Sequence, residues 1–237
     1  ASFSTPVATD ADWRTSGSAR SLTNTAVSGG VVHAAGRPFR VSVNALNAAG
    51  VVTTGYTGVP SLVFGGCALP ATCAGASAAS LIASFSTAAG VSVAPAATYA
   101  EAGSFSATAS DPDFANVDAA DGTPAAQRLI QSGNATIGRF VPDRYLLSLS
   151  NTPVLEPGQG VACTGRADWN FTWIGQAFRW ATAPTITVTA QDASGATVRQ
   201  YTGSLFKLTT GMVSLAWSSN APGSAPLTVT GQTLTLV

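Results

Sequence analysis

The sequence predicts an all-β protein that consists of two Ig-like β-sandwich domains in tandem. Apolar residues alternate with Ser or Thr along many short segments, as in half-buried strands. Gly, Pro, Asn and Asp separate these segments at the spacing of a sandwich, and signals for helices are nearly absent. One strand–turn–strand unit also occurs twice. The expected strands cover residues 39–46, 61–64, 90–94, 103–110, 144–150, 185–191, 212–219 and 226–236.

The composition favours a folded protein with a neutral, hydroxyl-rich surface. Charged residues make up 9% of the chain, where about 25% is typical, and the formal net charge is zero. Disordered chains usually carry a high net charge. Without a surplus of Lys and Arg, nucleic acid is not an expected partner. Because no apolar run approaches the roughly 20 residues of a membrane helix, no membrane span is expected either.

An internal repeat indicates the number of domains. Residues 36–58 and 175–203 share Gly-x-x-Phe-Arg, an alternating strand, an Asn/Asp-Ala-Ala/Ser-Gly turn and a final Tyr-Thr-Gly. The second copy carries an insertion around Pro184. Each copy is typical of two strands joined by a turn. We expect Tyr56 and Tyr201 to hold a corner, with the ring inside and the hydroxyl bonded to the backbone.

The repeat divides the chain into a sandwich with loop insertions at 1–137 and a second sandwich at 138–237. The second domain's first strand should begin at Tyr145, because Pro142 cannot lie in a central strand. This domain is short of strands or is continued by sequence outside the chain, and its open edge would be completed by that sequence, by the first domain or by another chain. The start at Ala1, without Met or a signal peptide, suggests a processed protein or an excised segment.

Two of the three cysteines lie close together in a loop. Cys67 and Cys73 are flanked by Gly and Pro, so we expect a disulfide that closes a small hairpin and places the protein outside the reducing cytosol. The alternative is two free thiols. The spacing is not a zinc pattern, because no His or second Cys pair lies nearby. Cys163 is then either buried and free or paired with another chain.

Several segments resemble one family. "IGRFVPDRY" (137–145), "FTWIGQAFRW" (171–180), "ITVTAQDASGATVRQYTGSLFKL" (186–208) and "TYAEAG" (98–103) are similar to the C-terminal region of MshQ-type proteins. Those proteins are encoded with the mannose-sensitive haemagglutinin pilus, a type IV pilus system, and this region of them has no known function. The resemblance covers residues 98–210. It implies an exported, surface-associated protein linked to pili and adhesion, and it supplies no catalytic residues.

The sequence offers no catalytic arrangement. His33 is the only histidine, so a Ser-His-Asp triad would have to use it. No Ser lies in the Gly-x-Ser-x-Gly motif of a nucleophile elbow. We therefore predict that the protein is not an enzyme, and that His33 lies in a loop or at a strand edge.

A run of aspartates is the candidate metal site. Asp111, Asp113, Asp118 and Asp121 lie within "SDPDFANVDAADG", and closely spaced carboxylates can bind Ca²⁺. A solvated loop is the favoured alternative, because no Glu follows at the EF-hand distance and Asp-Pro and Asp-Gly are ordinary turn formers. No cofactor is expected, and calcium is the one candidate metal.

Aromatic residues are the candidate ligand-binding residues. Trp169, Phe171 and Trp173 share one face if the segment is extended. If exposed, they would stack on sugar rings or grip a partner strand. The favoured alternative is that they are buried in the sandwich core, since aromatics dominate sandwich interiors.

Together these features predict a non-enzymatic structural or adhesion module, at the extracellular face of a bacterial cell. It would belong to a pilus-associated surface protein or a surface filament, and its partners would be neighbouring domains or subunits. The alternative is a carbohydrate-binding module that uses the aromatic segment to bind glycans, with or without calcium at residues 111–121.

Overall fold

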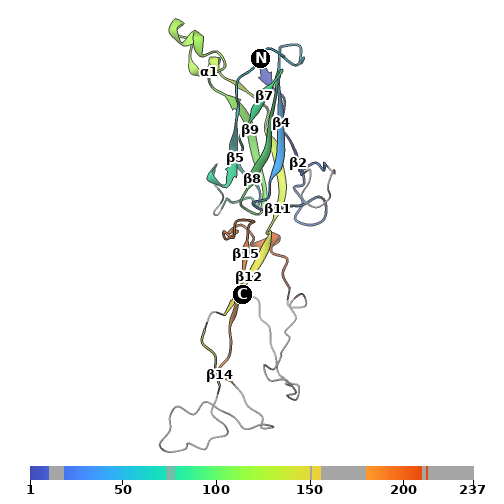
Figure 1. The fold of residues 1–237 in the computed structure, drawn as a ribbon, viewed down its shortest axis with the longest axis vertical. Helices are drawn as coiled ribbons and strands as arrows, with labels where there is room; N and C mark the ends of the chain where they lie inside the picture. The colour runs from blue at the N-terminus through green and yellow to red at the C-terminus, as the bar shows by residue number, and fades with distance from the viewer. Residues whose placement is uncertain are drawn as a thin grey trace, which may run out of the picture.

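The computed structural model describes residues 1–10, 19–73, 76, 78–149, 151–155, 180–209 and 212. Strands dominate these residues, and the helical elements are short: η1 (Ala78–Ser80), η2 (Asn116–Asp121), α1 (Ala125–Arg128) and η4 (Gly203–Leu205). This confirms the all-β class. Figure 1 shows a body of packed strands at the N-terminal end and a second, narrower unit that continues along the long axis.

The first sheet has six strands, and all of its pairings are antiparallel. The order is β1-β4-β8-β6, with β2 on β4 and β7 on β8. Its strands are β1 (Ser2–Phe3), β2 (Val7–Thr9), β4 (Phe39–Leu46), β6 (Leu81–Ile82), β7 (Ser86–Ala88) and β8 (Val91–Tyr99).

The second sheet has five strands in the order β10-β9-β11-β3, with β5 on β9. The pairing of β11 with β3 is parallel, and the other pairings are antiparallel. The strands are β3 (His33–Ala34), β5 (Ser61–Leu69), β9 (Gly103–Asp111), β10 (Ile130–Gln131) and β11 (Ala135–Val141). The strands that the sequence predicts in this body are present. Strand β11 was not anticipated, because its buried residues do not alternate with exposed ones, and the shortest strands were not, because so few residues give no clear alternation.

The core lies between these two sheets. Along β4, Phe39, Val41 and Val43 are buried while the intervening side chains are more exposed, as the alternation predicts. Tyr99 and Phe105 pack across the layers with ring centroids 4.5 Å apart. Each such buried side chain contributes about 1.5–3 kcal/mol relative to an exposed one.

The expected boundary between domains at 137 and 138 falls inside β11. This strand continues to Val141, and Phe140 is fully buried, opposite Gly103 on one side and His33 on the other. The domain predicted at 1–137 therefore extends to Val141, and the one predicted at 138–237 starts correspondingly later. The repeat gives the interval between its copies, but it does not show where the last strand of the first body ends.

The second unit contains two antiparallel ladders. In one, β12 (Arg144–Leu149) pairs with β15 (Ile186–Gln191), which agrees with the strands expected there. In the other, β13 (Val154–Leu155) pairs with β14 (Trp180–Thr182). Apart from Met212, the strands expected at 212–219 and 226–236 lie outside the described residues.

The internal repeat is visible as two turns of the same construction, one after β4 and one after β15. Each turn ends at a glycine with positive φ, 76° at Gly50 and 94° at Gly195, a conformation that glycine adopts without a steric penalty. In each, one side-chain oxygen accepts two backbone N–H bonds. The bonds run to Asn47 Oδ1 from Ala49 (2.9 Å) and Val51 (3.0 Å), and to Asp192 Oδ1 from Ser194 and Ala196 (both 2.9 Å).

A pair of aromatic rings also recurs with the repeat. Phe3 lies opposite Ala45 and packs against Tyr56, with ring centroids 5.5 Å apart. In the second unit, Tyr145 lies opposite Ala190 and packs against Tyr201, with centroids 6.0 Å apart. The two copies thus share their turn, their edge pairing and this ring contact.

Candidate functional site

The candidate functional site is the joint where the second unit meets the first body. A backbone hydrogen bond crosses it at Ala35, whose carbonyl accepts from Ala193 N at 3.0 Å. The N–H of Ala35 donates to Val141 O at 2.8 Å within the first body, and on the second unit Asp143 N donates to Gln191 O at 2.9 Å. The turn after β15 is therefore attached by a main-chain bond to the residue that follows β3.

An ion pair spans the same joint. Arg37 Nε donates to Asp143 Oδ1 at 2.8 Å, and Nη2 donates to Oδ2 at 3.2 Å. The side chain of Asp143 is 6% exposed, and that of Arg37 is 44% exposed. The guanidinium thus makes a two-pronged contact with a nearly buried carboxylate, the geometry that fixes orientation as well as charge.

A small apolar cluster fills the centre of the joint. Ala35 and Ala102 come from the first body, and Val198 and Leu205 come from the second unit; all four are buried. Leu69, Ala190 and Tyr201 pack against them. This cluster is separate from the main core between the two sheets.

Two buried polar residues complete the contact. Gln200 N donates to Glu101 Oε2 at 3.0 Å, and both residues are buried, at 1% and 5% exposure. Burial raises the pKa of the Glu101 carboxyl, while the hydrogen bonds from the backbone of Gln200 and Arg199, and the charge of Arg199, oppose this. The carboxylate therefore holds the segment after β15 against the first body.

The expected disulfide joins the end of β5 to the loop that follows it. Cys67 and Cys73 are joined, with Cα atoms 5.4 Å apart. The side-chain amide of Gln200 lies against this bridge, with Nε2 3.3 Å from Cys67 Sγ. The disulfide thus stands at the joint and not in a remote loop.

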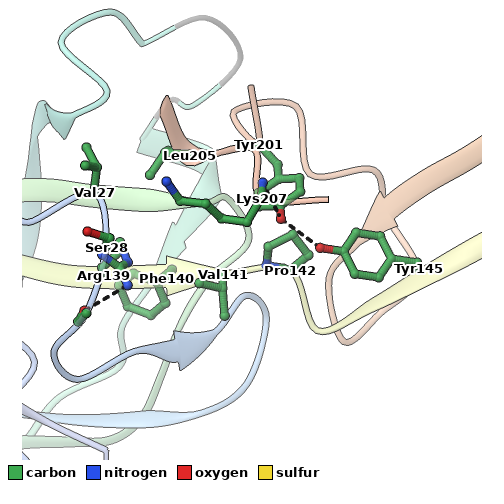
Figure 2. Close-up of a pocket in the computed structure, with 11 residues that line it drawn as sticks. Val27, Ser28, Arg139, Phe140, Val141, Pro142, Tyr145, Tyr201, Leu205 and Lys207 are labelled. Atoms are coloured by element: carbon green, nitrogen blue, oxygen red, sulfur yellow. Dashed lines mark hydrogen bonds between the residues drawn. The ribbon is translucent and has the colours of Figure 1, made fainter. Parts of the chain in front are cut away.

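A hollow of about 340 Å³ opens beside the joint (Figure 2). Tyr145 Oη donates to Tyr201 Oη at 2.9 Å, and the backbone N–H of Lys207 donates to the same oxygen at 3.1 Å. Arg139 lies at the opposite wall and is 7% exposed. Its guanidinium donates to the carbonyl oxygens of Ala26 and, at 2.9 Å, of Gly29, so its hydrogen bonds hold the loop before β3.

The corner tyrosines depart in part from expectation. The Tyr201 hydroxyl bonds to the backbone of Lys207, as expected. The Tyr56 hydroxyl instead donates to the Asp111 carboxylate, at 2.7 Å. The sequence pattern does not show whether a tyrosine hydroxyl bonds to the backbone or to a carboxylate. Asp111 is close to Tyr56 only because the fold places the end of β9 beside that corner.

The four aspartates predicted as metal ligands do not lie together in the structure. Asp111 is buried at the end of β9 and accepts from Tyr56 and from Asp113 N. Asp118 and Asp121 lie in η2 and are exposed. Within the described ranges, no three His, Cys, Asp or Glu side chains are grouped so that they could hold a metal ion.

Asp111 and Asp113 do line another hollow, of about 450 Å³, together with Tyr56, Thr57 and Phe114. Phe114 is 45% exposed, and its ring centroid lies 6.1 Å from that of Tyr56. The site combines an accessible aromatic ring with carboxylate and hydroxyl groups.

His33 lies on the edge strand β3, the second of the two positions expected for it, and it is fully buried there. Its ring packs edge-on against Phe39 and Phe140, with centroids 6.0 and 5.8 Å away. Nε2 lies 3.2 Å from Arg37 O, and Nδ1 lies 3.8 Å from Asp10 Oδ2. Burial lowers the pKa of the imidazole. These contacts are those of a core residue.

The other candidate residues, Trp169, Phe171, Trp173 and Cys163, lie outside the described residues. The sequence did not single out Arg37, Glu101 or Gln200, although Glu101 and Gln200 lie within segments that carry the family resemblance. No pattern of spacing joins these residues along the chain.

The family model for the third domain of DUF6701 matches residues 101–235, which is more than half of the chain. The chain belongs to the DUF6701 family. The match begins at Glu101, so the DUF6701 segment takes in β9, β10 and β11 of the first body and the strands of the second unit, whereas Ala35 and Arg37 of the joint precede it. No curated protein and no solved structure matches the chain. Among the described residues of this DUF6701 protein, no helix is long and apolar enough to span a membrane.

Proposed function

We propose that this chain is a non-enzymatic structural or adhesion module of a bacterial surface protein, in which two Ig-like β-sandwiches are coupled end to end. The observation that carries the proposal is the joint. There an ion pair, an apolar cluster, buried hydrogen bonds and a loop closed by a disulfide meet within one contact.

A contact of this kind would make the two units a rigid rod that holds the neighbouring domains of a surface protein apart. Domains in one chain move relative to each other unless their interface is large or apolar. Here Arg37 and Asp143 fix orientation, and the apolar cluster around Ala35 and Val198 excludes water. A force applied along the chain would then pass through both units without bending at a free hinge.

The cysteines and the family resemblance support the proposed compartment and parent assembly. A disulfide persists in an oxidising environment, which supports a site outside the cytosol. The similarity to MshQ-type proteins supports a pilus-associated surface protein or filament. Neighbouring domains or subunits would be the partners, because a surface with few charges packs against them with little desolvation cost.

Two measurements test this function. Protease treatment of intact cells should remove the protein from its surface location, whereas a protein confined to the cytosol would exclude the proposal. Single-molecule stretching of the chain between flanking marker domains should show that the two units resist force together. Arg37→Ala should lower the force at which the second unit separates, and Arg40→Ala, on an exposed position of β4, serves as the control.

Glycan binding is a second candidate, and the hollow around Tyr56 and Phe114 favours it. Sugars bind where an aromatic ring meets groups that accept hydrogen bonds, and here Phe114 is exposed beside Asp113. A glycan array with and without a chelator tests it. Binding that Phe114→Ala abolishes would favour this function, and binding that the chelator also abolishes would require calcium. An array without any signal would leave the structural role.

A further inference from the structure

One face of the β12–β15 ladder is apolar and open. The register places Tyr145 opposite Ala190, Leu147 opposite Val188, and Leu149 opposite Ile186. Because side chains alternate between the faces of a strand, these six share one face. Leu147, Leu149 and Ile186 are 60%, 56% and 48% exposed.

The opposite face of the same ladder has a different chemistry. It presents three pairs, Arg144 with Gln191, Leu146 with Thr189, and Ser148 with Thr187. Leu146 is the single apolar residue among these six. A solvated antiparallel sheet shows this division, apolar on the face that is covered and polar on the face in water.

The first body shows what the equivalent apolar face does. Its sheet presents Phe3, Val41, Val43 and Ala45, and each of them is at most 3% exposed. They are buried because the second sheet lies over them. The internal repeat makes the β12–β15 face the counterpart of this buried face. Among the described residues no second sheet covers it, so we expect another strand layer to lie over it.

A segment of the same chain has the composition of that layer. Residues 213–237 contain no charged side chain, and in three stretches of the segment apolar residues occupy every second position. The alternating sets are Val213, Leu215 and Trp217; Leu227 and Val229; and Leu234 and Leu236. Ser, Ala or Thr stands between the members of each set, as expected for strands with one buried face.

Two further observations favour this segment over a separate partner. The family match runs from residue 101 to residue 235, so the ladder and nearly all of the segment fall within one family unit. Covalent attachment also gives the segment an effective concentration in the millimolar range, which a separate chain rarely reaches.

We propose that residues 213–237 of this chain form a strand layer that covers the face of Tyr145, Leu147, Leu149, Ala190, Val188 and Ile186. The second unit then becomes a two-layer sandwich like the first body. This inference rests on the part of the proposed function that makes the second unit a sandwich, and not on the role of the chain in adhesion or as a spacer.

Footprinting of the unmodified chain tests the proposal directly. Carbene or hydroxyl-radical labelling is measured at Leu147 and at Leu146, which are neighbours on the same strand but lie on opposite faces. We expect several-fold less labelling at Leu147 than at Leu146, at every protein concentration, in a sample that light scattering shows to be monomeric. Equal labelling would overturn the proposal, and so would protection that appears only on dimerisation.

A matched pair of variants tests it again. Leu147→Lys should lower the midpoint of thermal unfolding by several degrees, because it buries a charge. Leu146→Lys should leave the midpoint within about a degree. Leu215→Lys should lower the midpoint as Leu147→Lys does, and Ser214→Lys should change it little. The double variant Leu147→Lys/Leu215→Lys should lower the midpoint by less than the sum of the two single changes, because both break the same contact. Strict additivity would place the segment elsewhere and overturn the proposal.

Discussion

Arg37 and Asp143 are far apart in the sequence, yet they form a two-pronged ion pair across the joint, with Nε–Oδ1 and Nη2–Oδ2 distances of 2.8 and 3.2 Å. The two sides of the pair differ, because Arg37 is half-exposed while the Asp143 carboxylate is nearly buried. Loss of one partner should therefore not be equivalent to loss of the other.

Arg37→Ala should destabilise the joint more than Asp143→Ala does. The arginine change leaves a carboxylate buried without its cation, whereas the aspartate change leaves a guanidinium that water can reach. We expect a fall of about 2–4 °C in the unfolding midpoint for Arg37→Ala, and a smaller fall for Asp143→Ala, by differential scanning calorimetry. The reverse order would show that the carboxylate is hydrated.

The stability of the joint should depend on pH through Glu101. Its folded-state pKa is raised by burial, so the folded protein binds the proton more tightly than the unfolded chain does. Stability should therefore fall as the pH rises from the ordinary carboxyl pKa of 4.5 through the raised value. Arg199 and Asp192 are the charged neighbours.

Glu101→Gln should remove this pH dependence while keeping an oxygen that accepts the hydrogen bond from Gln200 N. Denaturant titrations between pH 4 and pH 8 measure the effect. If the unfolding free energy of Glu101→Gln depends on pH as steeply as that of the wild-type protein, another group causes the pH dependence.

Reduction of the Cys67–Cys73 disulfide should weaken both the loop that it closes and the joint beside it. A bridge that closes so short a loop contributes about 2–3 kcal/mol by restricting the unfolded chain. Cys67→Ser/Cys73→Ser should show that loss in urea titrations with and without reductant. Proteolysis near Gln200 should also accelerate, because its side chain lies against the bridge. Unchanged proteolysis would mean that the disulfide-closed loop does not support the joint.

Gly36→Ala should open the joint. Gly36 has φ of 76°, and a Cβ there would lie 2.9 Å from Ala193 N. Gly50→Ala is a matched control, because its φ is also 76° but nothing lies within 4 Å of the added Cβ. Both changes should cost about 1–2 kcal/mol of backbone strain. Any further loss of unfolding free energy in Gly36→Ala, measured by chemical denaturation, reports the contact with Ala193 of the second unit. Equal losses in the two variants would show that the turn at Ala193 shifts to accommodate the added Cβ.

Much of the fold was predictable from local pattern. Strand β4 was expected at the residues where it lies, because Phe39, Val41 and Val43 alternate with polar neighbours. The turns at Asn47 and Asp192 were expected for the same local reason. The end of β11 was not, since its buried residues, unlike those of β4, do not alternate.

The candidate site was less predictable. The disulfide was expected, since the two cysteines are close in sequence and lie in one loop. The burial of His33 was missed, because it depends on Phe39 and Phe140, which reach it from other strands. The pairing of Asp111 with Tyr56, and the dispersal of the four aspartates, likewise depend on the position of β9.

The sequence by itself determined the all-β class, the strands with clear alternation, the repeated turn and the cysteine pair. Each of these is set by interactions between residues near one another along the chain. Only the tertiary structure decided that Arg37 meets Asp143 and that Gln200 meets Glu101, pairs separated by 106 and 99 residues. Such contacts form only after the sheets have brought distant segments together, so no local pattern encodes them.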